Sequence, residues 1–253
     1  MKKNKWVSIL VSIWLWIVFV GVIIPGMILI TTAYLIGKLT DKRLLLVHWV
    51  ATAWAWVLLR SCPFWNVKYY DFHNVPKKTA CVMISNHQSM LDILVLHRVH
   101  RPFKWVSKAE NFKVPVVGWV LTLNECLRIE RGKSSSATNL FKAARETLAM
   151  GSSLMLFPEG TRSVDGVMRP FKEGAFLMAK ESDVPILPIV LDGNYLSLPK
   201  NGLMLKQSSN IIVKALPVIP VEIVREKTVK ELMEYSRQLI ESELMRIRSS
   251  SKE

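Results

Sequence analysis

Two long stretches without charged side chains dominate the first sixty residues. The first covers residues 6–36 and the second residues 44–59. As straight helices they would measure about 46 Å and about 24 Å, against a hydrocarbon core of about 30 Å. The first is too long for one upright crossing, and Pro25 in its middle predicts a kink. We expect residues 1–60 to form a membrane-embedded two-helix element that anchors the chain.

From residue 61 onward, short apolar runs alternate with helical stretches. Seven runs are suited to buried strands: 67–72, 80–85, 103–106, 126–129, 154–158, 186–191 and 210–216. Four stretches are helical in pattern: 90–97, 135–150, 174–182 and 228–248. This alternation predicts an α/β domain, residues 61–253, in which helices flank a largely parallel sheet. The last helix should begin with a capping box from Thr228 to Glu231.

Charge refines the picture of the N-terminal element. The chain has 34 Lys and Arg against 20 Asp and Glu, and cations cluster before, between and after the two apolar stretches. These clusters are Lys2, Lys3 and Lys5; Lys38, Lys42 and Arg43; and Arg60 and Lys68. The positive-inside rule puts all three on the cytoplasmic side, which no spanning hairpin satisfies. We expect both helices to dip into one leaflet and return, with a two-span hairpin as the alternative.

The same charges indicate the kind of partner. Because the cations flank Trp-rich apolar stretches, they favour an anionic membrane surface and no nucleic acid partner. The expected location is the membrane, with the α/β domain on its cytoplasmic face, which is the inner membrane if the chain is bacterial. Cys62, Cys81 and Cys126 lack the spacing of a zinc site or a disulfide framework, so we expect no metal.

A histidine and an aspartate follow the second predicted strand and suggest acid–base chemistry. His87 and Asp92 are five residues apart, and on one continuous helix they would point about 140° away from each other. They can meet if the helix begins between them, and Ser89 followed by Asp92 resembles a capping box. A neutral imidazole held by a carboxylate can act as a general base near pH 7. The alternative is that Asp92 is only a first-turn acid.

A second polar segment, FPEGTRS at residues 157–163, follows another predicted strand. In a parallel sheet the carboxyl ends of strands lie along one edge and carry the chemistry. His87 and Glu159 would both lie at this edge. We therefore expect the two segments to converge on one crevice.

These residues resemble the 1-acylglycerol-3-phosphate acyltransferases, within the wider glycerolipid acyltransferases. Four sequence blocks carry the resemblance over roughly residues 68–220: Asn86-His87 with Asp92, RIER with Arg131, FPEGTRS, and VPILPIV at 184–190. Two departures weaken the second block, since Glu130 precedes Arg131 and Arg128 is a competing cation.

The resemblance implies an enzyme that transfers an acyl group from acyl-CoA or acyl carrier protein. The acceptor would be the sn-2 hydroxyl of lysophosphatidate and the product phosphatidate, with no cofactor beyond the acyl donor. His87 would be the base and Asp92 its partner. Backbone amides after Ser89 would stabilise the oxyanion.

The acceptor phosphate requires cations, and Arg162 is the first candidate because guanidinium groups bind phosphate through paired donors. Gly160 allows a tight turn, Thr161 can add a hydroxyl donor, and Glu159 would orient Arg162 or bind a glycerol hydroxyl. The resemblance also places Lys108 and Arg131 near the phosphate.

Three alternatives remain at this level. Ser89 could be a nucleophile beside His87, although the chain lacks a G-x-S-x-G elbow. The acceptor could be glycerol 3-phosphate or another lysolipid. Outside the enzyme class, the chain could be a membrane-anchored lipid-phosphate binder without catalytic activity.

Overall fold

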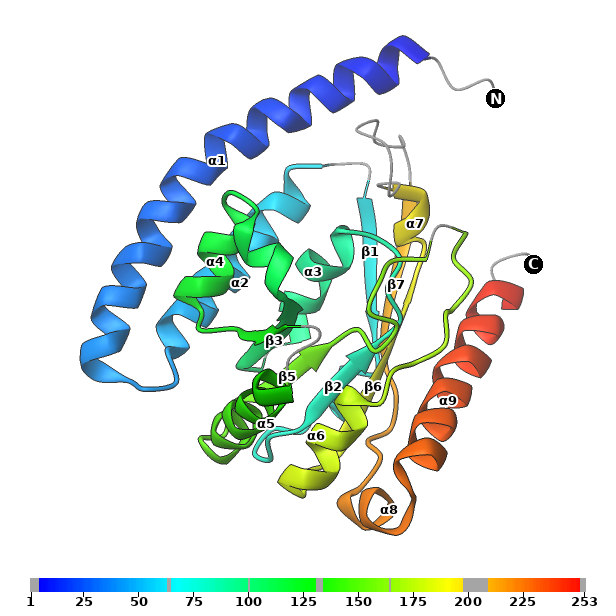
Figure 1. Ribbon diagram of the computed structural model, residues 1–253. Coiled ribbons are helices and arrows are strands. Elements are labelled where there is room, and N and C mark those ends of the chain that lie inside the picture. The colour runs from blue at the N-terminus through cyan, green and yellow to red at the C-terminus, as the bar shows by residue number, and fades with distance from the viewer. Residues whose placement is uncertain are drawn as a thin grey trace.

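A seven-stranded sheet with helices on both faces forms the centre of the computed structural model (Figure 1), which describes residues 5–62, 65–99, 101–130, 134–163, 165–197 and 209–250. The strand order is β1-β7-β6-β2-β5-β3-β4. The strands are β1 (Trp65–Tyr70), β2 (Val82–Ser85), β3 (Phe103–Lys108), β4 (Leu127–Ile129), β5 (Ser153–Leu156), β6 (Ile186–Asp192) and β7 (Ser209–Ala215). All seven predicted strands are present, with boundaries within two residues of the prediction.

The sheet is largely parallel, as predicted, with one antiparallel junction. Strands β2, β3, β4, β5 and β6 pair in parallel, and β1 pairs in parallel with β7. The antiparallel pair is β6 with β7. The carboxyl ends of β2, β5 and β6 therefore lie at the same edge of the sheet.

The four predicted helices of the second domain are confirmed: α3 (Leu91–Leu96), α5 (Ser134–Ala149), α6 (Gly174–Ser182) and α9 (Val229–Ser250). The capping box of α9 forms in both directions. Thr228 N–H donates to Glu231 Oε2 at 2.8 Å, and Glu231 N–H donates to Thr228 Oγ1 at 3.3 Å. Six short segments were not predicted: η1 (Phe72–Asn74), η2 (His97–Val99), η3 (Ala109–Lys113), α4 (Val117–Leu123), α7 (Asn194–Ser197) and α8 (Val221–Glu226). They are too short to show a helical repeat in the sequence.

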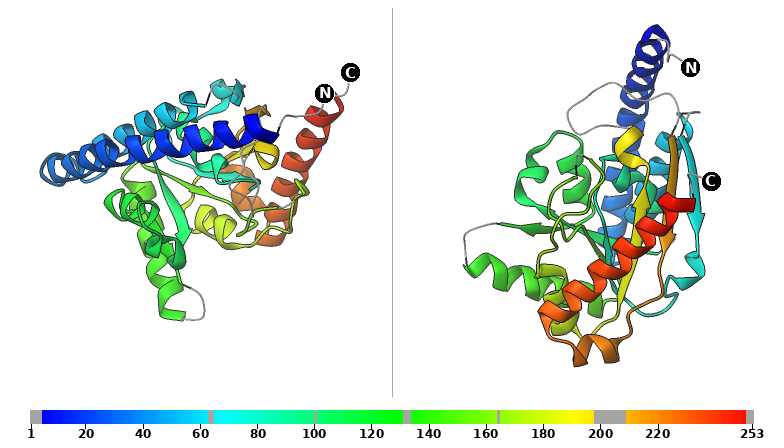
Figure 2. Two further views of the ribbon diagram at one scale, coloured as in Figure 1. Left: turned by 90° about the horizontal axis from the view of Figure 1, so that it is seen from above. Right: turned by 90° about the vertical axis from the view of Figure 1, so that its right-hand side faces the viewer.

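Alternation along the strands divides the core into two layers. In β2, Val82 and Ile84 point to the face covered by α5, α6 and α9, whereas Met83 points to the face covered by α3. Figure 2 shows α1 and α2 on one side of the sheet and α5 and α6 on the other. Because both faces are covered, β2 is buried along its whole length.

The N-terminal element is a hairpin of α1 (Lys5–Thr40) and α2 (Leu45–Arg60), which pack against each other. Within the described residues, one helix is long and apolar enough to cross a membrane by length and composition alone, Ile9–Thr40. Helix α1 continues through Pro25 and bends around the domain (Figure 1), and the predicted kink at Pro25 stays a prediction. Pro25 is exposed, and the backbone hydrogen bond that a proline removes can be accommodated by bending.

Candidate active site

The two polar segments predicted to converge do so because β2 and β5 are neighbours. Ile84 pairs with Leu156 in the parallel ladder, so the residues that follow each strand emerge side by side. The imidazole of His87 stacks on the ring of Phe157, with centroids 3.8 Å apart and planes at 8°. This stacking restricts the rotation of the imidazole about its side-chain bonds.

His87 and Asp92 form the predicted pair. Helix α3 begins at Leu91, so His87 lies outside its N-terminus and its Nδ1 lies 2.8 Å from Asp92 Oδ2. The Asp92 side chain is fully buried, whereas the His87 side chain is 14% exposed. Since the carboxylate accepts the Nδ1 proton, the other ring nitrogen, Nε2, presents its lone pair. Among the described residues, none forms a hydrogen bond with Nε2.

Four donors hold the buried Asp92 carboxylate. Besides His87, Oδ2 accepts the backbone N–H groups of Gln88 at 2.6 Å and Ser89 at 2.9 Å. Oδ1 accepts Nδ2 of Asn194, which is itself fully buried, at 2.6 Å. A buried carboxylate without such donors would be strongly destabilising. Asn194 therefore belongs to the site, although nothing in its local sequence beyond its place after β6 could have indicated this.

The oxyanion donors predicted after Ser89 stay a prediction, and several nearby amides have partners within the turn. The amides of Gln88 and Ser89 bond to Asp92, and the amide of Leu91 bonds to Ser89 Oγ at 3.3 Å. These three amides are hydrogen-bonded within the turn that brings His87 to Asp92. Ser89 is fully buried in the same turn, which disfavours it as a nucleophile.

The two roles predicted for Glu159 stay predictions, and the structure shows a further one. Its Oε1 accepts the backbone N–H of His87 at 2.8 Å and its Oε2 accepts that of Arg169 at 2.9 Å. The side chain is only 3% exposed, and burial raises the pKa of this carboxyl to about 7. Ser163 N–H in turn donates to the His87 carbonyl at 2.8 Å. Both polar backbone groups of His87 are thus bonded to the FPEGTRS segment, so Glu159 holds the backbone of His87 in place.

The candidate phosphate-binding residues come from neighbouring strand ends. Lys108 ends β3, which pairs with β5, and Thr161 and Arg162 are half-buried in the segment after β5. Gly160 has a φ of 65°, as a tight turn requires. A Cβ at Gly160 would lie 3.1 Å from Nζ of Lys172, which identifies Lys172 as a further cation against this turn.

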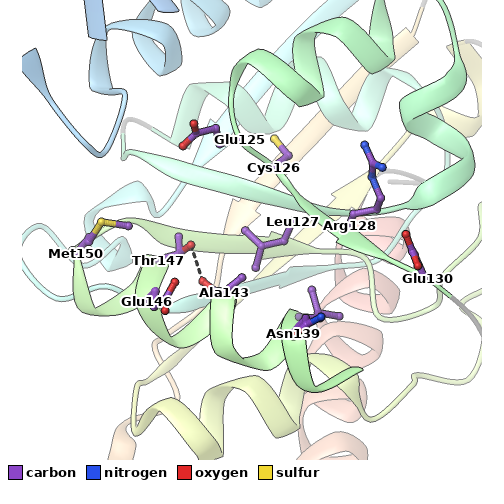
Figure 3. A pocket seen from close by; sticks show the side chains of 11 residues that line it. Glu125, Cys126, Leu127, Arg128, Glu130, Asn139, Ala143, Glu146, Thr147 and Met150 are labelled. Atoms are coloured by element: carbon purple, nitrogen blue, oxygen red, sulfur yellow. Dashed lines mark hydrogen bonds between the residues drawn. The ribbon is translucent and has the colours of Figure 1, made fainter. Parts of the chain in front are cut away.

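Arg131 lies outside the described residues, so its predicted role stays a prediction. Its competitor Arg128 stacks over the ring of Phe112 at 4.4 Å. Arg128 also lines a groove of about 590 Å³ between β4 and α5 (Figure 3). This groove contains neither His87 nor any residue of FPEGTRS, so it is separate from the candidate site. In the part of the chain that the structure describes, no group of three or more His, Cys, Asp or Glu side chains could hold a metal ion.

Comparisons with known proteins agree with the family resemblance that the four sequence blocks indicate. The model of the acyltransferase family matches residues 66–192, just over half of the chain. A 1-acyl-sn-glycerol-3-phosphate acyltransferase of Chlamydomonas reinhardtii is 35% identical over 81% of this chain and 60% of its own length. A chloroplastic enzyme of the same name from Brassica napus is 37% identical over 60% of this chain and 44% of its own length. The chain thus spans about half of the length of these relatives.

A solved structure shows the same fold. The crystal structure of the 1-acyl-sn-glycerophosphate acyltransferase PlsC from Thermotoga maritima is similar with a TM-score of 0.81, at 22% identity over 96% of this chain and 97% of that one. The match extends over the N-terminal hairpin as well as the sheet, because so little of either chain is left out. With its family model, its sheet and its four sequence blocks in agreement, the chain belongs to the acyltransferase family.

Proposed function

We propose that this protein transfers an acyl group from an acyl thioester to the sn-2 hydroxyl of 1-acylglycerol-3-phosphate, which forms phosphatidate. The observation that carries the proposal is the pair of His87 and Asp92, with the Asp92 carboxylate buried and His87 Nε2 presenting its lone pair. The names of the relatives from Chlamydomonas reinhardtii and Brassica napus support the same acceptor. The donor would be acyl-CoA or acyl carrier protein, and the proposal includes no metal or cofactor.

The reaction follows from the chemistry of this pair. Nε2 of His87 removes the proton of the acceptor hydroxyl as its oxygen attacks the thioester carbonyl carbon. The resulting imidazolium is stabilised by Asp92 through Nδ1. When the tetrahedral intermediate collapses, the carbon–sulfur bond breaks and the imidazolium returns the proton to the leaving thiolate. The acceptor hydroxyl is itself the nucleophile, so the reaction requires no acyl-enzyme.

Cations around the turn at Gly160 would bind the acceptor phosphate. Arg162 lies two residues after Gly160 in the FPEGTRS segment, and the Lys172 ammonium lies against that turn. Lys108 is the last residue of β3, which pairs with β5. A phosphomonoester carries about −1.5 to −2 charges near neutral pH, so several cations are expected to share it. Arg131, which immediately follows the described residue Glu130, stays a candidate from the family resemblance.

The packing of α1 supports a membrane location without an upright crossing. Buried or half-buried residues recur every three or four positions along the whole helix: Ser12, Leu15, Phe19, Val22, Gly26, Ile30, Ala33 and Gly37. Strongly exposed apolar residues occupy the opposite side: Ile13, Ile17, Val20, Ile24, Ile28, Leu35 and Leu39. Along this side α1 packs on α2 and on α4 of the domain, so we propose that it stays with the domain and does not span a bilayer. The hairpin would therefore lie in one leaflet, on the cytoplasmic side by the charge argument.

The decisive experiment measures thioester consumption by the purified full-length protein in detergent, with lysophosphatidate or glycerol 3-phosphate as acceptor. Faster turnover with lysophosphatidate is expected. His87→Ala should lower kcat by about 10²- to 10⁴-fold and leave lysophosphatidate binding intact, because it removes only the base. His73→Ala, at an exposed histidine in η1, is the matched control and should retain full activity. Full turnover by the His87 variant would refute the base, and preference for glycerol 3-phosphate would refute the acceptor.

A further inference from the structure

The catalytic domain exposes a small apolar surface beside the N-terminal hairpin. It is formed by Val114 and Pro115 in the loop before α4 and by Trp119 in α4. Val114 is 46% exposed and Trp119 is 55% exposed. A single exposed apolar residue is ordinary on a protein surface, but a tryptophan and a valine five residues apart, with the exposed Pro115 between them, call for an explanation.

Helix α4 is attached to the hairpin by its other residues. Val120 and Leu123 pack against a cluster that contains Ile30 and Ala33 of α1 and Val47 of α2. At about 100° per residue, Trp119 lies about 40° around the helix from Leu123. By this geometry Trp119 lies next to the side of α4 that contacts the hairpin.

The backbone around these residues has little conformational freedom. A Cβ at Gly118 would lie 2.1 Å from the carbonyl oxygen of Phe112, so only glycine permits this close approach. Val116 has a φ of 65°, a conformation that a β-branched residue adopts only when its surroundings impose it. Trp119 follows directly after Gly118, so the restricted backbone before it fixes its exposed position.

We propose that Val114, Pro115 and Trp119 form a second membrane contact, which inserts into the same leaflet as the hairpin. This inference rests on the proposed membrane location of α1 and α2. The occupant is bilayer lipid, because α4 packs on α1, and the exposed side of α1 is itself apolar, with Leu35 61% and Leu39 88% exposed. Tryptophan is the residue preferred at the boundary between hydrocarbon and headgroups.

Charge around the surface agrees with a lipid partner. Lys113 is exposed directly before Val114. Lys38, close to the end of α1, forms an ion pair with Glu125, two residues after α4. Each exposed cation near an anionic membrane adds to the attraction, and the effect falls with salt. Insertion at α4 would fix the rotation of the domain about the hairpin, because the lipid would then contact two separate elements.

Lipid-based fluorescence quenching tests this contact directly. Single Cys substitutions at Trp119, at Leu35 as the positive control and at Met245 as the negative control would carry a bimane label. Met245 is a 61% exposed apolar residue of α9, which packs on the opposite face of the sheet. Burial raises the pKa of the Cys81 and Cys126 thiols to about 11, so at pH 7 these native cysteines react poorly. The labelled proteins are bound to phosphatidylcholine–phosphatidylglycerol vesicles that contain acyl-chain nitroxide lipids.

Nitroxide lipid should quench the labels at positions 119 and 35 but not at 245, and aqueous iodide should quench only the label at 245. Quenching at 35 without quenching at 119 would overturn the second contact and leave the membrane anchor intact. Quenching at neither position would overturn the anchor itself. The emission of the label at 119 is also measured without vesicles. A blue shift that grows with protein concentration would mean that a second copy of the chain covers this surface instead of lipid, which would overturn the proposal. None of these readouts requires turnover, so they are independent of the proposed reaction.

Substitution at the same position gives a second measurement. Trp119→Glu should weaken vesicle binding by about tenfold or more, whereas Met245→Glu should leave it unchanged. Thioester turnover with detergent-solubilised lysophosphatidate should be equal in both variants and the unsubstituted protein. Equal vesicle binding by the two variants would contradict the proposal.

Discussion

At the scale of single residues, the site depends on how the partners of His87 are held. Asp92 and Glu159 are both buried carboxylates, and each accepts hydrogen bonds from more than one segment of the chain. His87 could be selected from the sequence because its distance to Asp92 along the chain is short. Asn194 and Glu159 could not be assigned their contacts, since these join residues 102 and 72 positions apart.

Removal of the Asn194 amide should impair catalysis more than binding. Asn194→Ala deletes the donor to Asp92 Oδ1 and should lower kcat by about 10- to 100-fold with little change in KM. Asn194→Asp puts a second carboxyl against Asp92 and should lower kcat further at pH 8. Its activity should partly recover at lower pH, where the new carboxyl becomes a donor. Steady-state kinetics with Asn139→Ala, an exposed residue of the groove in Figure 3, as the control would test this, and a purely KM effect would contradict it.

Glu159 should make the stability of the protein depend on pH. Burial raises its pKa from 4.5 to about 7 in the folded state, so between these values the folded state binds more protons than the unfolded state. The contribution of this group to the free energy of unfolding is therefore largest below about pH 4.5 and decreases as pH rises towards 7. Glu159→Gln cannot titrate and should remove this decrease. Thermal unfolding of both proteins at pH 5 and pH 7.5 measures it, and an identical pH dependence in the two would exclude the effect.

At the scale of helices and strands, the sequence predicted an element where its packing requires a regular apolar pattern, and it missed an element where the packing does not. The central strands β2, β5 and β6 were predictable because they are almost entirely apolar, and α9 was predictable because Thr228 and Glu231 mark its start. The short helix α4 was not, because its seven residues face two different clusters and so show no single apolar stripe. Helix α1 was predictable from its long apolar run, and it continues through the exposed Pro25.

Two glycines of α1 provide a matched test of the hairpin. A Cβ at Gly26 would lie 2.6 Å from the ring of Trp54 in α2, whereas a Cβ at Gly21 would meet no atom within 4 Å. Gly26→Ala should lower the free energy of unfolding by about 1–3 kcal/mol through overpacking. Gly21→Ala should be neutral or stabilising by up to about 1 kcal/mol, because alanine favours the helix. Thermal unfolding in detergent compares them, and equal effects would mean that the α1–α2 contact does not determine stability.

At the scale of the whole molecule, the sequence predicted a sheet with helices on both faces but not how the hairpin attaches to the domain. The apolar content of α1 is compatible with a spanning helix, a buried helix or an interfacial one. Only the three-dimensional packing distinguishes them, because it shows one side of α1 buried from Ser12 to Gly37 and the other exposed. The mixed sheet is a similar case, since the direction of β7 depends on its pairing with β6 and not on its own residues.

The packing of α1 along one side has a consequence for kinetics. In the proposed position, flat against one leaflet, the protein would meet an acyl-chain-bearing acceptor by lateral diffusion in two dimensions, and it would return its product to the same leaflet. Its rate should follow the mole fraction of acceptor among the surrounding lipids and not the total amount per volume. Adding inert phospholipid would then slow the reaction at constant bulk concentration, and the lipid composition of the host membrane would itself regulate the flux.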